Sequence, residues 1–128
     1  MKLLRGVVHH YDWGDQQTIP EFLGVEPDAK PWAELWFGTH RSGPSLVKTS
    51  TGNQSLEQYA GDLSFLVKII AAAKPLSLQT HPTDEQAQLG YQQENEIGVP
   101  LDSPLRIYKD ISAKPELLIA MSAFEAIC

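Results

Sequence analysis

Short runs of alternating apolar and polar residues recur along the chain, a period-two pattern that is typical of half-buried β-strands. Nine prolines and nine glycines interrupt these runs, as in a β-rich fold with many connections. The pattern predicts strands within residues 3–14, 33–40, 41–47, 63–74, 75–81, 105–110 and 115–128. We therefore expect a mainly β fold that contains one or two short helices.

Two helices are expected from terminal signals rather than from hydrophobic periodicity. Thr83 reads as an N-cap, with Gln86 three residues later completing a capping box, and Asp84 and Glu85 follow in the first turn, where the helix dipole favours acids. This helix should extend to about Gln93. A shorter helical turn is predicted before Gly61, and residues 15–31 are expected to form loop or short helix.

The length, charge and apolar content of the chain argue against some classes of partner. The chain has 128 residues, a length that fits one domain with its own core. Its formal net charge of −6 and scattered basic residues argue against nucleic acid as a partner. The longest apolar run is too short to cross a bilayer, so no membrane partner is expected. The single cysteine fits a reducing compartment, and the cytoplasm is the expected location.

The last predicted strand, ELLIAMSAFEAIC, is apolar up to the final residue of the sequence. We expect such a segment either to dock deep in the core or to belong to a longer chain, and truncation is the favoured interpretation. An exposed apolar surface should then remain where further strands would pack. Self-association, or another chain, would cover it.

The stretch PLSLQTHPTDEQ, residues 75–86, carries the first candidate chemistry. On a strand, Ser77, Gln79 and His81 share one face, and an amide oxygen and an imidazole nitrogen two residues apart can bind one metal ion. By itself the pattern fits a solvated polar face better. Lys114 and Glu116 repeat this spacing before the last apolar run, where Glu116 is a possible carboxylate ligand and Lys114 a cation or proton carrier. There too the pattern alone favours a strand entrance in water.

Lys68 is a stronger candidate, because large apolar residues flank it in FLVKII and a buried ammonium group is costly unless it is paired. Trp13 could pack its apolar face against a sugar ring or belong to the core. Glu34 precedes a strand and is also compatible with a surface position. His9 and His10 point to opposite faces of one strand, so they cannot form a local metal pair, and we assign them no function.

Five blocks of sequence occur in the order found in a known family: YDWG, AELWFGTHRSGPS, LSFLVKIIAAAKPLSLQTHP, YKD and KPELLIAMSAFEAIC. They cover most of the chain, which on these blocks resembles the type I phosphomannose isomerases (mannose-6-phosphate isomerases). The resemblance implies a cupin-like β-jelly-roll, incomplete in this chain. Residues 1–128 would be the N-terminal portion of its catalytic domain.

The resemblance also implies a zinc site, with Gln79, His81 and Glu116 as ligands. Lys114 is the candidate for proton transfer, and Ser77, Lys68, Trp13 and Glu34 fall at positions associated with substrate. The implied reaction interconverts mannose 6-phosphate and fructose 6-phosphate through an enediol intermediate. Zinc suits it because a Lewis acid stabilises the developing oxyanion, while a side chain moves the proton.

Two departures from the family pattern qualify this expectation. A fourth zinc ligand and a catalytic arginine are expected beyond residue 128, and Ala113 stands where long forms often carry a histidine before the K-P-E lysine. We therefore expect the isolated chain to be inactive or impaired. The alternative is a non-catalytic cupin-like module that binds sugars or another protein. A metal-dependent oxygenase fits less well, because such sites usually use more histidines.

Overall fold

The computed structural model describes residues 2–127, which form short strands and three helices. The chain divides into two compact units, Met1–Leu76 and Ser77–Cys128. In chain order the elements are β1 (Leu4–Arg5), β2 (Val7–His9), α1 (Thr18–Leu23), β3 (Glu34–Phe37), β4 (Leu46–Thr49), β5 (Gly52–Ser55), α2 (Leu56–Ala60), β6 (Val67–Ile70), β7 (Leu76–Ser77), α3 (Asp84–Glu96) and β8 (Ala126–Ile127). The mainly β fold expected from the sequence is confirmed.

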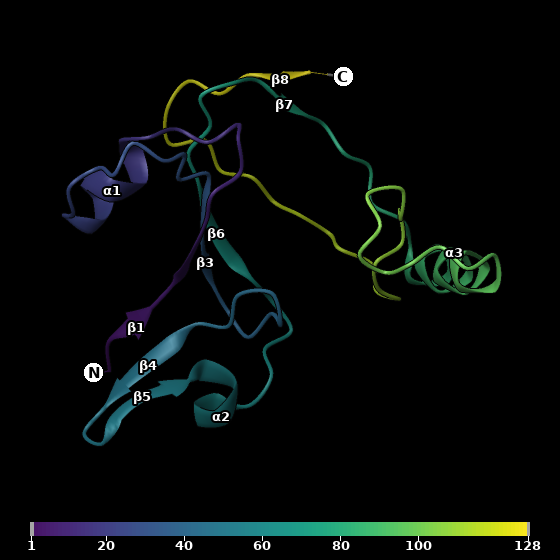
Figure 1. Cartoon of the computed structure of the whole chain (residues 1–128), viewed down its shortest axis with the longest axis horizontal. Coiled ribbons are helices and arrows are strands. Elements are labelled where there is room, and N and C mark those ends of the chain that lie inside the picture. Colours follow the sequence, from purple (N-terminus) through teal and green to yellow (C-terminus); the bar gives the residue numbers. More distant parts are fainter. Residues whose placement is uncertain (1, 128) are drawn as a thin grey trace. The chain divides into compact units, whose positions relative to one another are not determined.

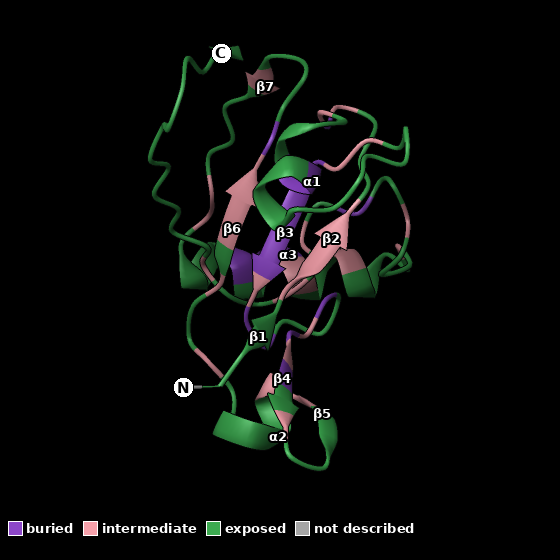
Figure 2. Cartoon of the chain, turned by 90° about the vertical axis from the view of Figure 1, so that its left-hand side faces the viewer, coloured by how far each residue is buried: buried purple, intermediate pink, exposed green. Residues whose placement is uncertain are grey.

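The centre of the first unit is an antiparallel sheet in the order β2–β3–β6. Figure 2 shows the middle strand β3 as buried between two partly buried neighbours. In the register of the sheet, Glu34 lies opposite His9 on one side and Ile70 on the other, and Trp36 lies opposite Lys68. Each strand contributes alternate residues to the two faces, so this register decides which side chains meet.

The two faces of this sheet differ in chemistry. On one face, Leu35 packs with Ile19 of α1 and with Ala71, and Val8 and Ile69 lie against this cluster. The opposite face carries His9, Glu34, Trp36 and Lys68, as the register requires. The first face is the hydrophobic core of the unit, and the second face presents polar and aromatic groups.

A second antiparallel sheet of the first unit has the order β1–β4–β5, and α2 follows β5 directly (Figure 1). The sequence did not predict β5, because its residues GNQS are polar and lack the alternation of a half-buried strand. Its pairing comes from a tight connection after Thr49, where Gly52 adopts a φ of 126° that favours glycine. The geometry of the turn therefore produces a strand that has no pattern of buried apolar residues in its sequence.

Helix α1 is a third helix in a region for which loop or short helix was expected. Asp15 accepts hydrogen bonds from the backbone N–H groups of Gln17 and Thr18, at 2.7 and 2.5 Å, and these bonds start the helix. They also hold the pKa of Asp15 below its usual value, with the bond from Thr18 as the largest cause. Gly24 ends the helix in the left-handed conformation.

The second unit contains α3, and its predicted capping box is present. Thr83 accepts from the N–H of Gln86, and the Gln86 side chain accepts from the N–H of Thr83. The helix extends to Glu96, three residues past the expected end. Ala87 and Gly90 are its buried residues, and a Cβ at Gly90 would lie 2.4 Å from the ring of Tyr108. Glycine thus permits close packing against this helix.

Two strand predictions in the second unit are wrong. Residues 105–110 form no strand, because Glu94 accepts the N–H groups of Ile107 and Tyr108 and thereby takes the donors that a strand partner would use. Residues 115–128 were expected to form one long strand, yet the regular structure described there is β8, which pairs with β7. Likewise β7 ends at Ser77, so Gln79 and His81 lie outside any strand.

Apolar side chains of the last segment are exposed, as the sequence led us to expect. The most exposed are Leu117 at 88% and Met121 at 93%. Self-association through this segment stays a prediction. Within residues 2–127, no helix combines the length and apolar character needed to cross a bilayer.

Candidate metal centre and the polar face of the sheet

His81 and Glu116 come from distant parts of the sequence and meet in the second unit. The imidazole Nε2 of His81 lies 3.4 Å from Oε2 of Glu116. This nitrogen is shielded from solvent, and it has no hydrogen-bond partner among the described residues. A shielded nitrogen that has no hydrogen-bond partner and lies close to a carboxylate oxygen is suited to binding a cation.

The separation fits two ligands of one metal ion. Zinc binds nitrogen and oxygen at about 2.0–2.2 Å, so two ligands on a tetrahedral ion lie about 3.3–3.5 Å apart. The described part of the chain holds no group of three or more His, Cys, Asp or Glu side chains suited to a metal. A further ligand from that part would therefore be of another kind, such as the amide oxygen of Gln79. Gln79 is exposed and lies two residues before His81.

Lys114 and Ser77 belong to the same unit. The Lys114 ammonium lies 2.6 Å from Oδ2 of Asp110, while Oδ1 of that carboxylate accepts the N–H of Ser112. Asp110 thus closes a short turn and holds the amine of Lys114. To move a proton elsewhere, Lys114 would have to leave this pair. Ser77 is exposed at the end of β7.

The predicted residues of the first unit lie on or beside the polar face of the β2–β3–β6 sheet. Glu34 is buried, so the surface alternative for this residue is wrong. It accepts a hydrogen bond of 2.6 Å from the indole N–H of Trp36. The Lys68 ammonium lies 5.1 Å from the centre of the Trp36 ring, within the range of a cation–π contact. Lys68 is therefore half-buried over an aromatic ring, on a face less apolar than its neighbours in sequence suggested.

A row of rings continues from this face. The His9 and Tyr11 rings stack at 5.6 Å, the Tyr11 and Trp13 rings at 5.7 Å, and the His9 and Trp36 centroids are 4.0 Å apart. Trp13 is the half-buried end of this row. From the sequence, His9 was expected to have no functional role. Only the pairing of His9 with Glu34 places it beside these residues, and that pairing cannot be read from one strand alone.

Burial lowers the pKa of His9 below its usual value of 6.5, and the charges of Lys68 and His10 lower it further, while Glu34 acts in the opposite direction. The imidazole is therefore neutral at pH 7. Burial, followed by the charge of Glu34, raises the pKa of Tyr11. Both effects keep uncharged rings on this face of the sheet.

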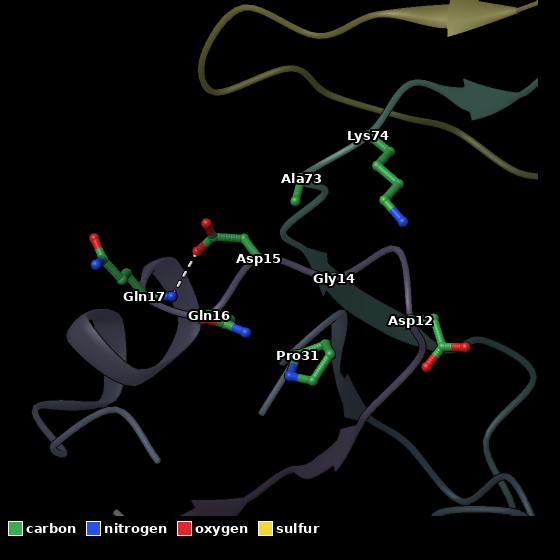
Figure 3. Close-up of a pocket in the computed structure, with 8 residues that line it drawn as sticks. All are labelled: Asp12, Gly14, Asp15, Gln16, Gln17, Pro31, Ala73 and Lys74. Carbon is green, nitrogen blue, oxygen red and sulfur yellow. Dashed lines mark hydrogen bonds between the residues drawn. The ribbon is translucent and has the colours of Figure 1, made fainter. Parts of the chain in front are cut away.

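A separate pocket of the first unit lies where α1 begins, and its lining is shown in Figure 3. The lining residues are Asp12, Gly14, Asp15, Gln16, Gln17, Pro31, Ala73 and Lys74. Asp15 is already engaged with the start of α1, as the dashed bond to Gln17 shows. None of the predicted site residues lines this pocket.

The chain matches a known protein family along its whole length. The family model of the type I phosphomannose isomerase catalytic domain matches residues 1–128. A phosphomannose isomerase structure from Salmonella typhimurium, an E134A mutant, has a TM-score of 0.76 and 32% sequence identity, over 88% of this chain and 33% of that chain. The fold is thus a mainly β, cupin-like one. The chain belongs to the type I phosphomannose isomerase family.

Curated relatives agree with this assignment. The chain is 34% identical to mannose-6-phosphate isomerase of Escherichia coli, over 99% of this chain and 37% of that protein. It is 32% identical to mannose-6-phosphate isomerase 1 of Arabidopsis thaliana, over 100% of this chain and 33% of that protein. The chain therefore spans about a third of the length of these relatives. One Salmonella typhimurium relative, with a TM-score of 0.74 and 33% identity over 89% of this chain and 33% of that chain, was solved with fructose 6-phosphate and zinc bound.

Proposed function

We propose that residues 1–128 form part of the catalytic domain of a zinc-dependent aldose–ketose isomerase that interconverts mannose 6-phosphate and fructose 6-phosphate. The observation that carries the proposal is the 3.4 Å separation of His81 Nε2 and Glu116 Oε2 in a chain of this family. The zinc and fructose 6-phosphate seen in the Salmonella typhimurium relative support the choice of metal and substrate. The expected location is the cytoplasm.

In this proposal His81, Glu116 and Gln79 hold the zinc. When bound, the ion supplies a Lewis acid that stabilises negative charge on the sugar oxygens during isomerisation. His81 serves as a neutral ligand through Nε2, and Glu116 adds the negative charge that a divalent cation needs. The exposed amide of Gln79 would have to turn toward this pair.

Lys114 is the proposed proton carrier, which moves a proton between the two carbon atoms, or between their oxygen atoms, that differ in the aldose and ketose forms. Its contact with Asp110 holds the ammonium in place before substrate arrives. Substrate phosphate or hydroxyl groups would then compete with Asp110 for that amine. Ser77, with its exposed hydroxyl, is proposed to bind the sugar.

Lys68, Glu34 and Trp13 are proposed as the substrate-binding residues of the first unit. Glu34 is fixed by the Trp36 indole, so its carboxylate is held ready to accept a bond from a sugar hydroxyl. Lys68 offers a half-buried cation suited to an anionic sugar, and Trp13 offers a ring face suited to its apolar side.

The test is a zinc titration of the chain, followed by an isomerase assay on the loaded protein. His81→Gln and Glu116→Gln should each weaken zinc binding by more than about tenfold, since loss of a ligand exceeds the usual effect of an outer residue. His10→Gln and Glu85→Gln are the matched controls and should bind zinc as the wild type does. Equal affinity of all five proteins would overturn the metal site.

Ala113 and the engagement of Lys114 with Asp110 favour a second candidate, a non-catalytic module that binds sugar phosphates. The same titration separates the two. Conversion of mannose 6-phosphate that His81→Gln abolishes would support the isomerase. Because residues 1–128 alone are expected to be inactive or impaired, the assay is repeated on a chain that extends beyond residue 128. Binding of zinc and sugar phosphate without conversion by either chain would support the module.

A further inference from the structure

Two contacts join the segment after β7 to the segment that carries Lys114 and Glu116. The first is the pair of His81 and Glu116, at 3.4 Å. The second is a hydrogen bond of 2.6 Å, in which the N–H of Ala113 donates to Oδ1 of Asp84. Between the two contacts, the first segment advances from residue 81 to residue 84, and the second segment goes back from residue 116 to residue 113. The two segments therefore run antiparallel and in register.

This register is not fixed by a strand ladder. Residues 78–83 and 111–120 have no helix or strand, so no regular series of backbone bonds sets the distance between them. Three residues of chain span at most about 10 Å, which places the Asp84 contact close to the His81–Glu116 pair. The Asp84 side chain at the start of α3 thus fixes the alignment of the two segments, as the backbone bonds of a neighbouring strand do in a sheet.

The other end of α3 is bonded to the same part of the chain, residues 106–116, which we call the returning segment. The buried guanidinium of Arg106 donates to the carbonyl of Val99 at 2.7 Å and to Oδ1 of Asn95 at 2.9 Å. Glu94 accepts the N–H groups of Ile107 and Tyr108. The helix is therefore bonded to the returning segment near both of its ends, and Asp84 is the attachment nearer to Glu116.

The Asp84 carboxylate is separate from the capping of α3. The capping box consists of Thr83 and Gln86, whose side chains accept the N–H groups of Gln86 and Thr83, and the Asp84 side chain takes no part in it. Replacing Asp84 should therefore leave the helix start intact and remove the bond to Ala113. This separation makes the contribution of Asp84 measurable.

We propose that Asp84 is a positioning residue, which holds the Ala113–Glu116 segment in the register that sets the distance between Glu116 and His81. The inference rests on the proposed metal site for its function, and on the His81–Glu116 and Asp84–Ala113 contacts for its structural content. Asp84 is not among the residues proposed to bind metal or substrate. It acts through the backbone of Ala113 on the placement of Glu116.

The first experiment uses the apo protein, so it does not depend on metal binding. The NMR signal of the His81 ring should move when Glu116→Gln is introduced, because the carboxylate lies 3.4 Å from Nε2. In an Asp84→Ala background the same substitution should move the signal much less. Asp84→Asn keeps an acceptor oxygen and should restore the response, and Glu85→Ala, one residue along the same helical turn, should leave it unchanged. An equal response in all backgrounds would overturn the proposal.

The second experiment measures zinc affinity and the absorption spectrum of bound cobalt in the same variants. Asp84→Ala should weaken zinc binding about tenfold and change the cobalt spectrum, as outer residues that orient ligands typically do. Asp84→Asn should bind nearly as the wild type does, and Glu85→Ala should match it. Absence of zinc binding by the wild type would refute the metal site alone, while the apo NMR result would still decide the role of Asp84.

Discussion

Each of the two units is stabilised internally by a different kind of interaction. In the first unit, Leu35 and Ile19 are almost fully buried, and the β2–β3–β6 sheet encloses them on one face. In the second unit, the larger apolar residues of the last segment are exposed, and the most buried charged group is Arg106. Burial of apolar side chains stabilises the first unit, whereas hydrogen bonds from the buried Arg106 guanidinium hold much of the second unit.

This difference matters for the candidate residues in each unit. Glu34 and Lys68 stand on a sheet whose other face is a core, so the backbone that carries them is fixed by packing. His81 and Glu116 stand on irregular segments, whose placement depends on individual polar contacts. A site on polar contacts tolerates fewer substitutions, because each lost partner leaves a buried or oriented group unsatisfied.

The largest effect is expected from Arg106→Ala. It removes the cation that pairs with the Glu94 carboxylate at 3.1 Å and the donor to the carbonyls of Val99 and Tyr108. The loss should cost the second unit about 3–5 kcal/mol of unfolding free energy. Hydrogen exchange measured by mass spectrometry should show lost protection in residues 84–116, while β2, β3 and β6 keep theirs. Arg5→Ala, an exposed arginine of β1, is the control. Equal loss of protection in both units would contradict the comparison.

A smaller effect is expected from Leu35→Ala, which removes a side chain that is 1% exposed and should destabilise the first unit by about 3 kcal/mol. Leu117→Ala is the matched change in the second unit. Because Leu117 is 88% exposed, its loss should alter the unfolding free energy by less than about 0.5 kcal/mol. Denaturant unfolding measures both. Similar costs for the two leucines would show that Leu117 is buried in solution.

The smallest effect concerns pH and His9. Its folded pKa lies below 6.5, so below that pH the unfolded chain binds the proton more readily than the folded one. Protonation of His9 therefore favours the unfolded chain. The unfolding free energy of the first unit is not reduced by this effect above about pH 6.5, and it decreases as the pH falls from there toward the folded pKa of His9. His9→Gln should flatten this part of the stability curve of the first unit, measured by denaturant unfolding between pH 7.5 and 5.5. His10→Gln is the control, since it leaves His9 in place, and a slope unchanged by His9→Gln would contradict the expectation.

The sequence predicted those elements whose signals are local or strongly periodic. Alternation located β2, β3 and β6, and the capping box of Thr83 and Gln86 located α3 to within three residues at its end. It failed at β5, whose residues are polar, and at residues 105–110, where Glu94 takes the backbone donors. Both failures come from hydrogen bonds that hydrophobic pattern does not record.

For the candidate site, the sequence singled out the residue types and their spacing, and the resemblance to a family assigned them roles. The sequence alone did not show that Glu34 is buried, or that His9 lies against it. Both facts follow from the pairing of β2 with β3. Residues that lie far apart in sequence become neighbours only through such pairings.

By itself the sequence determined the mainly β class, the capped helix after His81 and the family to which the chain belongs, because these depend on local pattern and on ordered motifs. Only the tertiary structure decided that His81 and Glu116 meet at 3.4 Å and that Asp84 holds the Ala113 backbone. The physical reason is that both contacts close long loops of chain, and no local pattern encodes the partner at the far end.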